Sequence, residues 1–463
     1  NKVDMITLSF EKGTLVVASN FKLPHTVWDD RSQCFRSSPS FYNDLIEYLN
    51  VSGLEYEDKV LDLMPMPSLS CDLCLRGYQK TAMAKWLQTK RGALVLPTGA
   101  GKTVIGLKAI SALNVPTLVI VPTLELVQQW KRELADKLDI DAGTYSGEAH
   151  IMRPITVSTY DTAYLRAEEL GNRFLLIIFD EVHHLPSPGY ANIAELFVAP
   201  YRLGLTATYE REDGRHTELE RLIGGKVYEI GIDKLTGKHL AEYKTEKIVT
   251  ELTDAERAEY EYYHTIFTEF LKTRKIILRT PRDFRLFVMR SGRDASAREA
   301  LLARNKARQI ALNSQSKLNS LSEILDLHFG ERMIIFTEHN SLVYAISKQF
   351  LIPAITHTTQ KDERADILQK FRAGKYKVIV TSKVLEEGID VPEASVGIIL
   401  SGSGSKREYK QRLGRILRKK EGKLAVLYEL VSKKTTEVGI SRRRKDTGTK
   451  TRADIKTSSK QEH

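Results

Sequence analysis

Cysteine is scarce in this chain, and its apolar runs are short. Only three of the 463 residues are cysteine, which argues against a disulfide framework and for a reducing compartment. Cys71 and Cys74 form a C-x-x-C pair, but a zinc site would need a second pair or suitably spaced histidines, so we expect reduced thiols and no structural metal. No apolar segment reaches the ~20 residues that span a membrane, and polar residues interrupt the N-terminal run Ile6–Ala18, so we expect no signal peptide. We therefore expect a cytoplasmic protein with no membrane partner.

Positive charge is concentrated in two segments of a chain whose net charge is +11. Residues 272–318 hold thirteen Lys and Arg against three acids, and residues 401–463 hold nineteen against seven, so the remainder is acidic. Such segments attract polyanions such as nucleic acid, or they form solvated helix faces. We favour a polyanion partner for residues 272–318, because they interrupt an ordered domain. Residues 436–463 are expected to form a flexible basic tail.

The first 65 residues have the pattern of a small α+β domain. Ile6–Phe10 and Thr14–Ala18 predict a β-hairpin, a helix is predicted near Ser40–Asn50, and a proline-containing linker follows. The aromatic residues of this domain could stack on distorted bases of a nucleic acid, or they could form a plain small core. These residues, with the arginines beside them, are Trp28, Phe35, Tyr42, Arg31 and Arg36.

Residues 66–243 and 244–435 each alternate short apolar strands with helical segments. Strands of this kind, buried on both faces, belong to parallel sheets covered by helices, and ligands bind where their carboxyl ends meet. A helical insertion, about residues 254–318, is predicted to begin at a capping box formed by Thr253 and Glu256. The predicted strands are Ala93–Leu96, Thr117–Val121, Ile155–Ser158, Leu175–Phe179 and Leu203–Leu205, then Ile248–Leu252, Met333–Phe336, Ala354–Thr356, Lys377–Thr381, Val396–Leu400 and Leu424–Leu430.

A glycine-rich segment, Leu-Pro-Thr-Gly-Ala-Gly-Lys-Thr, lies between the first of these strands and a predicted helix. Gly99 and Gly101 allow the backbone N–H groups to turn toward an anion. Lys102 adds a positive charge for the β and γ phosphates, and the Thr103 hydroxyl can bind Mg²⁺. Leucine stands where the strict phosphate-loop pattern has its first glycine. We expect a nucleoside triphosphate to be bound by Pro97, Thr98, Gly99, Ala100, Gly101, Lys102 and Thr103.

Two acids, Asp180 and Glu181, follow the apolar strand Leu175–Phe179 in the sequence Asp-Glu-Val-His. Phosphoryl transfer needs a carboxylate that holds Mg²⁺, which suits Asp180. It also needs a group that orients and deprotonates the attacking water, which suits Glu181.

A third motif, Gln-Arg-Leu-Gly-Arg-Ile-Leu-Arg, lies in the second α/β domain and supplies Gln411, Arg415 and Arg418. On a helix the two arginines, three residues apart, share one face and can stabilise the charge of a transferring phosphoryl group. Hydrolysis would then require the two α/β domains to close on the nucleotide.

These motifs, in this order, resemble those of the superfamily 2 helicases, and the resemblance spans roughly residues 75–430. It implies two tandem RecA-like domains, with ATP and Mg²⁺ as cofactors, and the family accepts an apolar residue at the position of Leu96. The segment Thr206-Ala207-Thr208 resembles the motif that links hydrolysis to nucleic-acid binding. By position, the resemblance assigns adenine contacts to Arg76 and Gln79, nucleotide contacts in the fifth motif to Gly388 and Asp390, and nucleic-acid contacts to Thr123, Thr159, Thr337 and Thr381.

Within the superfamily the chain looks most like the XPB family, in a short archaeal or bacterial form. The resemblance rests on Asp-Glu-Val-His, on Leu-Arg-x-Tyr-Gln, and on the longer motifs at 205–213 and 384–392. It implies a role in DNA opening for Arg211 within Arg-Glu-Asp, and it makes the basic insertion a thumb-like element. In this chain Thr358 follows His357, where relatives often have glycine.

The resemblance implies an ATP-dependent DNA helicase or translocase with 3′ to 5′ polarity that opens duplexes in nucleotide excision repair. It would grip the DNA backbone without reading sequence, and other repair factors, such as a nuclease, are expected partners. Three alternatives stay open. They are a motor that moves along duplex DNA without separating strands, a helicase acting on RNA, and a non-processive ATP-gated DNA clamp.

Overall fold

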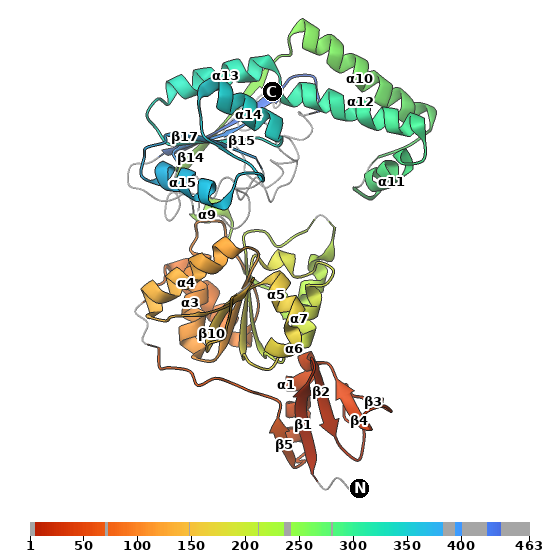
Figure 1. The fold of residues 1–463 in the computed structure, drawn as a ribbon, viewed down its shortest axis with the longest axis vertical. Coiled ribbons are helices and arrows are strands. Elements are labelled where there is room, and N and C mark those ends of the chain that lie inside the picture. Colours follow the sequence, from red (N-terminus) through yellow and green to blue (C-terminus); the bar gives the residue numbers. More distant parts are fainter. Residues whose placement is uncertain are drawn as a thin grey trace, which may run out of the picture. The chain divides into compact units, whose positions relative to one another are not determined.

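The computed structural model describes residues 5–69, 73–147, 149–211, 213–235, 242–278, 281–382, 394–400 and 424–436. Contacts divide the chain into two compact units, the first of which extends to Leu235. The first unit holds an N-terminal domain and an α/β domain. The second holds another α/β domain with a helical insertion (Figure 1).

The N-terminal domain is a five-stranded sheet with one helix packed on it. The predicted hairpin is confirmed, and its strands alternate buried and partly buried residues, as a sheet with one covered face requires. The strand order is β3-β4-β2-β1-β5, with β1 and β5 parallel and the other pairs antiparallel. Its elements are β1 (Ile6–Glu11), β2 (Thr14–Ala18), β3 (Val27–Asp29), β4 (Cys34–Ser37), η1 (Pro39–Phe41), α1 (Tyr42–Val51) and β5 (Tyr56–Lys59).

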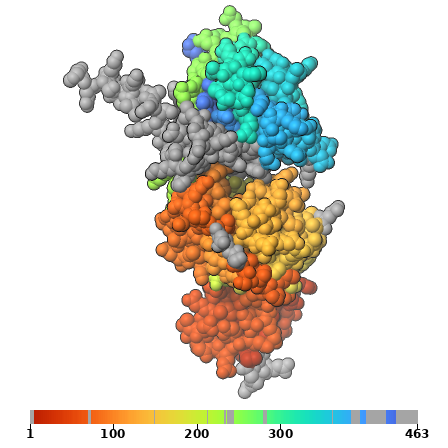
Figure 2. Space-filling view, turned by 90° about the vertical axis from the view of Figure 1, so that its left-hand side faces the viewer, coloured from red at the N-terminus to blue at the C-terminus, as the bar shows by residue number. Residues whose placement is uncertain are grey.

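This N-terminal domain is docked on the first α/β domain by apolar and polar contacts. Val198 of the α/β domain belongs to the core of the N-terminal domain. The Ser38 hydroxyl donates to the Glu195 carbonyl at 2.8 Å, and the Asn172 amide donates to the Val60 carbonyl at 2.8 Å. In Figure 2 the two domains, red to orange and orange to yellow, abut directly.

The first α/β domain is built on an eight-stranded sheet of order β13-β6-β12-β11-β7-β10-β8-β9. All neighbours are parallel except β8 and β9. Helices α3 and α4 cover one face and α5 to α7 the other (Figure 1). The elements are α2 (Gly77–Thr89), β6 (Arg91–Val95), α3 (Lys102–Leu113), β7 (Thr117–Val121), α4 (Leu124–Leu138), β8 (Gly143–Ser146), β9 (Ala149–Ile151), β10 (Ile155–Thr159), α5 (Tyr160–Leu165), α6 (Ala167–Leu170), β11 (Leu176–Asp180), η2 (Val182–His184), α7 (Ala191–Leu196), β12 (Tyr201–Thr206), η3 (Arg215–Glu218), α8 (Leu219–Ile223), β13 (Lys226–Glu229) and α9 (Ile232–Leu235).

The second α/β domain has six parallel strands in the order β14-β19-β18-β15-β17-β16. Strand β14 is longer than predicted: it starts at Glu242 and pairs with β19 as far as Thr250. β14 is an edge strand, and it carries charged residues such as Lys244 and Glu246. A prediction based on apolar runs therefore misses its first residues. The elements are β14 (Glu242–Thr250), α13 (Gln315–Leu327), β15 (Met333–Phe336), α14 (Asn340–Phe350), β16 (Ala354–Ile355), α15 (Lys361–Arg372), β17 (Val378–Thr381), β18 (Val396–Ile399) and β19 (Leu424–Ser432).

The insertion consists of α10 (Asp254–Thr273), α11 (Pro281–Ser291) and α12 (Ala295–Leu312). The predicted capping box is present: Thr253 Oγ1 accepts from Glu256 N at 3.3 Å, and Glu256 returns the bond to Thr253 N at 3.0 Å. Helices α10 and α12 lie side by side (Figure 1). Their close approach is permitted by a row of buried alanines at helical spacing, Ala297, Ala300, Ala303, Ala307 and Ala311. Within the described residues no helix combines the length and apolar composition that crossing a bilayer requires.

Candidate functional site

The glycine-rich loop joins β6 to the N-terminus of α3. Leu96 is fully buried, and its N–H donates to the Thr206 carbonyl at 2.9 Å, so this position still belongs to the sheet and not to the turn. That explains why leucine is accepted where the strict pattern has glycine. Gly99 (φ 80°) and Gly101 (φ 77°) have left-handed backbones, and Gly101 caps α3. Backbone N–H groups at the start of a helix are ready donors to a phosphate.

The start of α2 holds this loop in place. Gln79 Oε1 accepts from the Arg76 N–H at 2.8 Å, and Gln79 Nε2 donates to the Ala100 carbonyl at 3.0 Å. The Tyr78 hydroxyl donates to the same carbonyl at 2.7 Å. Gln79 is therefore a support for the phosphate loop, a role that the sequence did not indicate. An adenine contact by Arg76 and Gln79 remains a proposal.

Lys102, Asp180 and Glu181 come together beside the loop. Asp180 ends β11 and is buried, with Oδ2 accepting from Trp130 Nε1 at 2.9 Å and Oδ1 accepting from Glu181 N at 3.0 Å. Burial, reinforced by the charge of Glu181, raises the pKa of Asp180 to about 6, although Trp130 and Lys102 favour the carboxylate. Lys102 Nζ lies 3.9 Å from Glu181 Oε1. One lysine thus faces two acids, an arrangement suited to a bound phosphate–metal complex.

The donor atoms here suit Mg²⁺. Thr103 in the first turn of α3 offers a hydroxyl and Asp180 offers a carboxylate, both oxygen donors of the kind that this hard cation prefers. Across the described ranges no group of three or more His, Cys, Asp or Glu side chains could hold a metal. A nucleotide-bound Mg²⁺ needs only one or two protein ligands, since phosphates and water supply the rest.

Glu181 is connected to the segment Thr206-Ala207-Thr208. Its Oε2 lies 3.5 Å from both Thr206 Oγ1 and His183 Nδ1, and His183 Nδ1 lies 3.0 Å from Thr206 Oγ1. The Thr206 hydroxyl donates its proton to the Thr208 carbonyl at 2.7 Å, so His183 Nδ1 is the donor in the third contact. Glu181 itself has a left-handed backbone (φ 50°), a conformation that is costly for a non-glycine residue and that clusters at functional sites.

The candidate nucleic-acid residues of the first unit have local partners. Thr123 and Thr159 are the N-caps of α4 and α5, each accepting a backbone N–H of its own helix. A phosphate at Thr123 would therefore meet the N-terminus of α4, a helix of 15 residues, and helix N-termini favour anions. Arg211 forms two bonds to Asp213, at 2.9 and 2.7 Å, and also donates to the His183 carbonyl. These bonds lower the pKa of Asp213 well below its usual range.

The candidates of the second unit lie at the carboxyl ends of β15 and β17. Thr337 N donates to the Thr381 carbonyl at 3.0 Å, and both side chains are fully buried. Neither hydroxyl is accessible to DNA in this conformation. Glu338, next along the chain, accepts two bonds from Arg308 of α12 at 2.8 and 2.7 Å, which ties the insertion to its sheet. Gly388, Asp390, Gln411, Arg415 and Arg418 lie outside the described residues.

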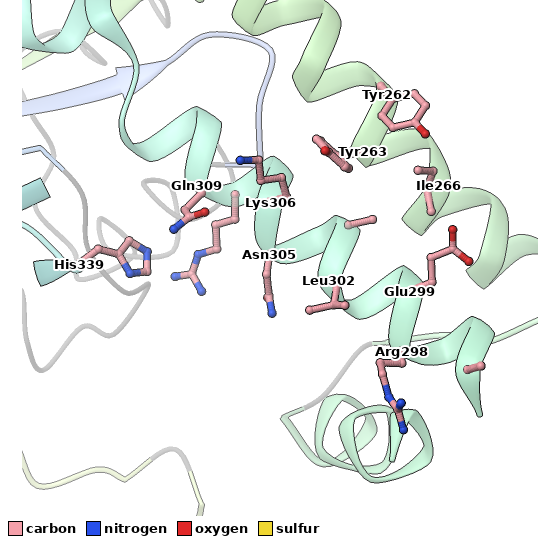
Figure 3. Close-up of a pocket in the computed structure, with 13 residues that line it drawn as sticks. Tyr262, Tyr263, Ile266, Arg298, Glu299, Leu302, Asn305, Lys306, Gln309 and His339 are labelled. Atoms are coloured by element: carbon pink, nitrogen blue, oxygen red, sulfur yellow. The ribbon is translucent and has the colours of Figure 1, made fainter. Parts of the chain in front are cut away.

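A groove of about 960 Å³ runs between α10 and α12 (Figure 3). Tyr262 and Tyr263 line it from α10, Arg298 and Lys306 from α12, and His339 from the start of α14. Tyr262 is 63% exposed. Aromatic rings beside cationic groups are the surface that single-stranded nucleic acid uses for stacking and charge neutralisation. The sequence indicated the charge of this segment but not the groove.

Three family models match the chain. Residues 8–60 match the damage recognition domain of the Xeroderma pigmentosum group B helicase, residues 72–211 the res subunit of type III restriction enzymes, and residues 316–420 the helicase conserved C-terminal domain. In order, these matches cover the N-terminal domain, most of the first α/β domain and most of the second.

Several curated relatives of this chain are named as XPB helicases or translocases. The chain is 46% identical to the "DNA 3′-5′ translocase XPB2" of Sulfurisphaera tokodaii, over 96% of this chain and all of that protein. It is 31% identical to the "DNA 3′-5′ helicase XPB" of Mycobacterium tuberculosis, over 78% of this chain and 61% of that protein. The XPB subunit of the Drosophila melanogaster general transcription and DNA repair factor IIH is 30% identical over 82% of this chain, which spans about half of that protein (47%).

A solved structure supports the fold independently. The Hef helicase domain of Pyrococcus furiosus superposes with a TM-score of 0.53 at 19% identity, over 80% of this chain and 97% of that one. At this identity the likeness concerns the fold alone. The expected α/β fold, with two RecA-like domains, is confirmed.

Proposed function

This chain belongs to the XPB family of superfamily 2 DNA helicases, in its archaeal form, and we propose that it hydrolyses ATP at the first α/β domain to move 3′ to 5′ along DNA. The observation that carries the proposal is the convergence of Lys102, Asp180 and Glu181 beside a loop with left-handed glycines. Binding of a triphosphate and activation of water both have their groups there.

Each side chain has a distinct task in this proposal. The helix N-terminus of α3 and Lys102 bind the phosphates, while Thr103 and Asp180 would hold Mg²⁺, which supplies charge neutralisation when bound. Glu181 orients water and accepts its proton, while the N–H at His183 Nδ1 faces the Glu181 carboxylate at 3.5 Å and is itself positioned by Thr206. From the sequence resemblance alone, Gln411, Arg415 and Arg418, with Gly388 and Asp390, are proposed to complete the site.

A repair role is supported by the match of residues 8–60 to a damage recognition domain. The sequence left open whether the aromatic residues of this domain stack on bases or form its core, and the answer differs from residue to residue. Tyr42 is buried, with its hydroxyl donating to Asp58 at 2.6 Å, and it belongs to the core. Trp28 is 44% exposed and meets Phe35 edge to face, so it offers a surface on which an unstacked base could rest. We propose that this surface contacts damaged or distorted DNA.

The proposal is tested by ATP hydrolysis in the presence of single-stranded, duplex and forked DNA, with RNA for comparison. DNA is expected to stimulate hydrolysis more than RNA does, and a 3′-tailed duplex is expected to be separated. Displacement of a triplex strand without duplex separation would instead indicate a motor that tracks along duplex DNA. Tight, nucleotide-dependent binding without any displacement would indicate a clamp. Absence of stimulation by any nucleic acid contradicts both the helicase and the motor that tracks along duplex DNA.

Replacing Lys306 in the groove with alanine is expected to weaken DNA binding equally for different sequences. The Lys306 side chain is about half exposed, and its ion pair with Glu259 is long, at 3.9 Å, so its charge is available to a phosphate. For single-stranded DNA, loss of one phosphate contact lowers the slope of log K against log salt by about 0.7. The matched control is Lys370→Ala on α15, because Lys370 is paired with Asp366 at 2.7 Å and lies away from the groove. An unchanged salt slope for Lys306→Ala would remove the groove from the DNA path.

A further inference from the structure

Two buried aromatic side chains from different helices reach the same residue, Asp180. Trp130 of α4 is 1% exposed and donates its indole N–H to the Asp180 carboxylate at 2.9 Å. Tyr160 of α5 is also 1% exposed and donates its hydroxyl to the Asp180 carbonyl at 3.0 Å. The side chain and the backbone of this acid are therefore held from two separate elements.

Both helices begin at the residues proposed to meet the DNA backbone. Thr123 caps α4, and Trp130 lies seven residues further on, about two turns along the same helix. Thr159 caps α5, and Tyr160 is the next residue. A rigid helix transmits a displacement of its N-terminus along its length, so a phosphate that pulls on either cap also moves an aromatic donor to Asp180.

The indole has little freedom to absorb such a movement. It packs against Gly106 of α3 so closely that a Cβ built on that glycine would lie 2.5 Å from Trp130 Cη2. Helix α3 is the one that starts at Lys102. Trp130 thus belongs to α4, the helix of the proposed DNA surface, and packs against α3, the helix that follows the phosphate loop. It also donates a hydrogen bond to Asp180. In a close-packed interior, a shift of one of these elements is passed on to the others.

We propose that Trp130 and Tyr160 are positioning residues that set Asp180 according to whether DNA contacts Thr123 and Thr159, and so make ATP hydrolysis depend on DNA. The inference rests on the proposed function, since it needs both ATP turnover at Asp180 and DNA at these two threonines. It adds the physical connection between the two sites, which are otherwise separate surfaces of one domain.

Trp130→Phe tests this connection, with Trp86→Phe as its matched control. Trp86 of α2 is also fully buried and donates its N–H to a backbone carbonyl, that of Arg202, at 3.0 Å. Each variant removes one indole and one buried N–H, but only one of them reaches Asp180. We expect Trp130→Phe to lower the ratio of DNA-stimulated to basal hydrolysis about tenfold, within the usual range for coupling between sites. Trp86→Phe should leave the ratio unchanged, whatever it costs in thermal stability.

A second measurement does not depend on turnover. The chain has only three tryptophans, Trp28, Trp86 and Trp130, so Trp28→Phe with Trp86→Phe leaves Trp130 as the only tryptophan, whose emission is followed by excitation at wavelengths that tyrosine does not absorb. Its fluorescence is expected to change when single-stranded DNA is added without nucleotide. Tyr160→Phe, which removes one hydroxyl and little volume, is expected to lower the stimulation ratio in the same direction as Trp130→Phe.

The possible outcomes distinguish a failure of this inference from a failure of the proposed function on which it rests. Wild-type protein that DNA does not stimulate would overturn the proposed function. Normal wild-type stimulation, with a ratio in Trp130→Phe equal to that in Trp86→Phe, would overturn the connection alone. If Trp130→Phe fails to fold, Tyr160→Phe and the fluorescence of the sole Trp130 decide: an unchanged ratio together with unchanged emission contradicts the inference.

Discussion

Replacing Lys102 with alanine is expected to reduce ATP hydrolysis at least about a thousandfold, the scale on which charged groups at a phosphoryl transition state act. Lys102 is the first residue of α3, and its side chain is only 11% exposed. The variant loses the positive charge that meets the β and γ phosphates. It also leaves the two neighbouring acids without their cation, which further disfavours the charged form of Asp180, since Lys102 lowers that pKa.

The measurement is phosphate release at saturating DNA and Mg²⁺ across a range of ATP concentrations. Lys108→Ala is the control, because Lys108 lies further along the same helix and is not part of the loop. A thermal melt of both variants shows whether the fold is kept. More than a tenth of wild-type turnover in Lys102→Ala would contradict the assignment of the phosphate loop.

Replacing Glu181 with glutamine is expected to stop hydrolysis while ATP still binds. Glutamine keeps the shape of the side chain between Lys102, His183 and Thr206 but cannot accept the proton of the attacking water. General base catalysis contributes about 10² to 10⁴ in rate, so turnover should fall by that factor. Loss of one negative charge beside Lys102 should, if anything, strengthen the attraction for triphosphate.

Single-turnover hydrolysis and binding of a fluorescent ATP analogue separate these two effects. Glu195→Gln is a suitable control, because Glu195 is a surface acid of α7 paired with Arg221 at 2.6 Å. Loss of binding together with turnover would show that Glu181 holds the nucleotide complex and is not the base.

The sheets, and the place of the glycine-rich loop between a strand and a helix, were predictable because their signals are local. Strands buried on both faces, such as β7 and β11, read as unbroken apolar runs, and the motif residues follow them directly. Strands β8 and β13 were missed, since Gly143–Ser146 and Lys226–Glu229 carry small, polar or charged residues that resemble loops. Their strand identity depends on neighbours distant in the sequence.

The contacts that support the site were less predictable. Nothing in the spacing of Trp130 and Asp180, fifty residues apart, indicates that they share a hydrogen bond. The same holds for Gln79, whose partner Ala100 lies on another element. The resemblance assigned nucleic-acid contacts to Thr337 and Thr381, but both side chains are fully buried, because Thr381 ends the interior strand β17 and Thr337 directly follows the interior strand β15. Tertiary packing, and not local pattern, decides each of these cases.

The hydrogen bonds from Tyr78 and Gln79 to Ala100 also bear on how quickly ATP is captured. Fixing one backbone residue costs about 1–2 kcal/mol of conformational entropy, and a loose loop would lose that entropy at each encounter with a ligand. In this loop the loss occurs once, when the chain folds. ATP association then needs no ordering of the loop. An enzyme that binds a new ATP in every catalytic cycle therefore starts each cycle with its phosphate loop already in the binding conformation.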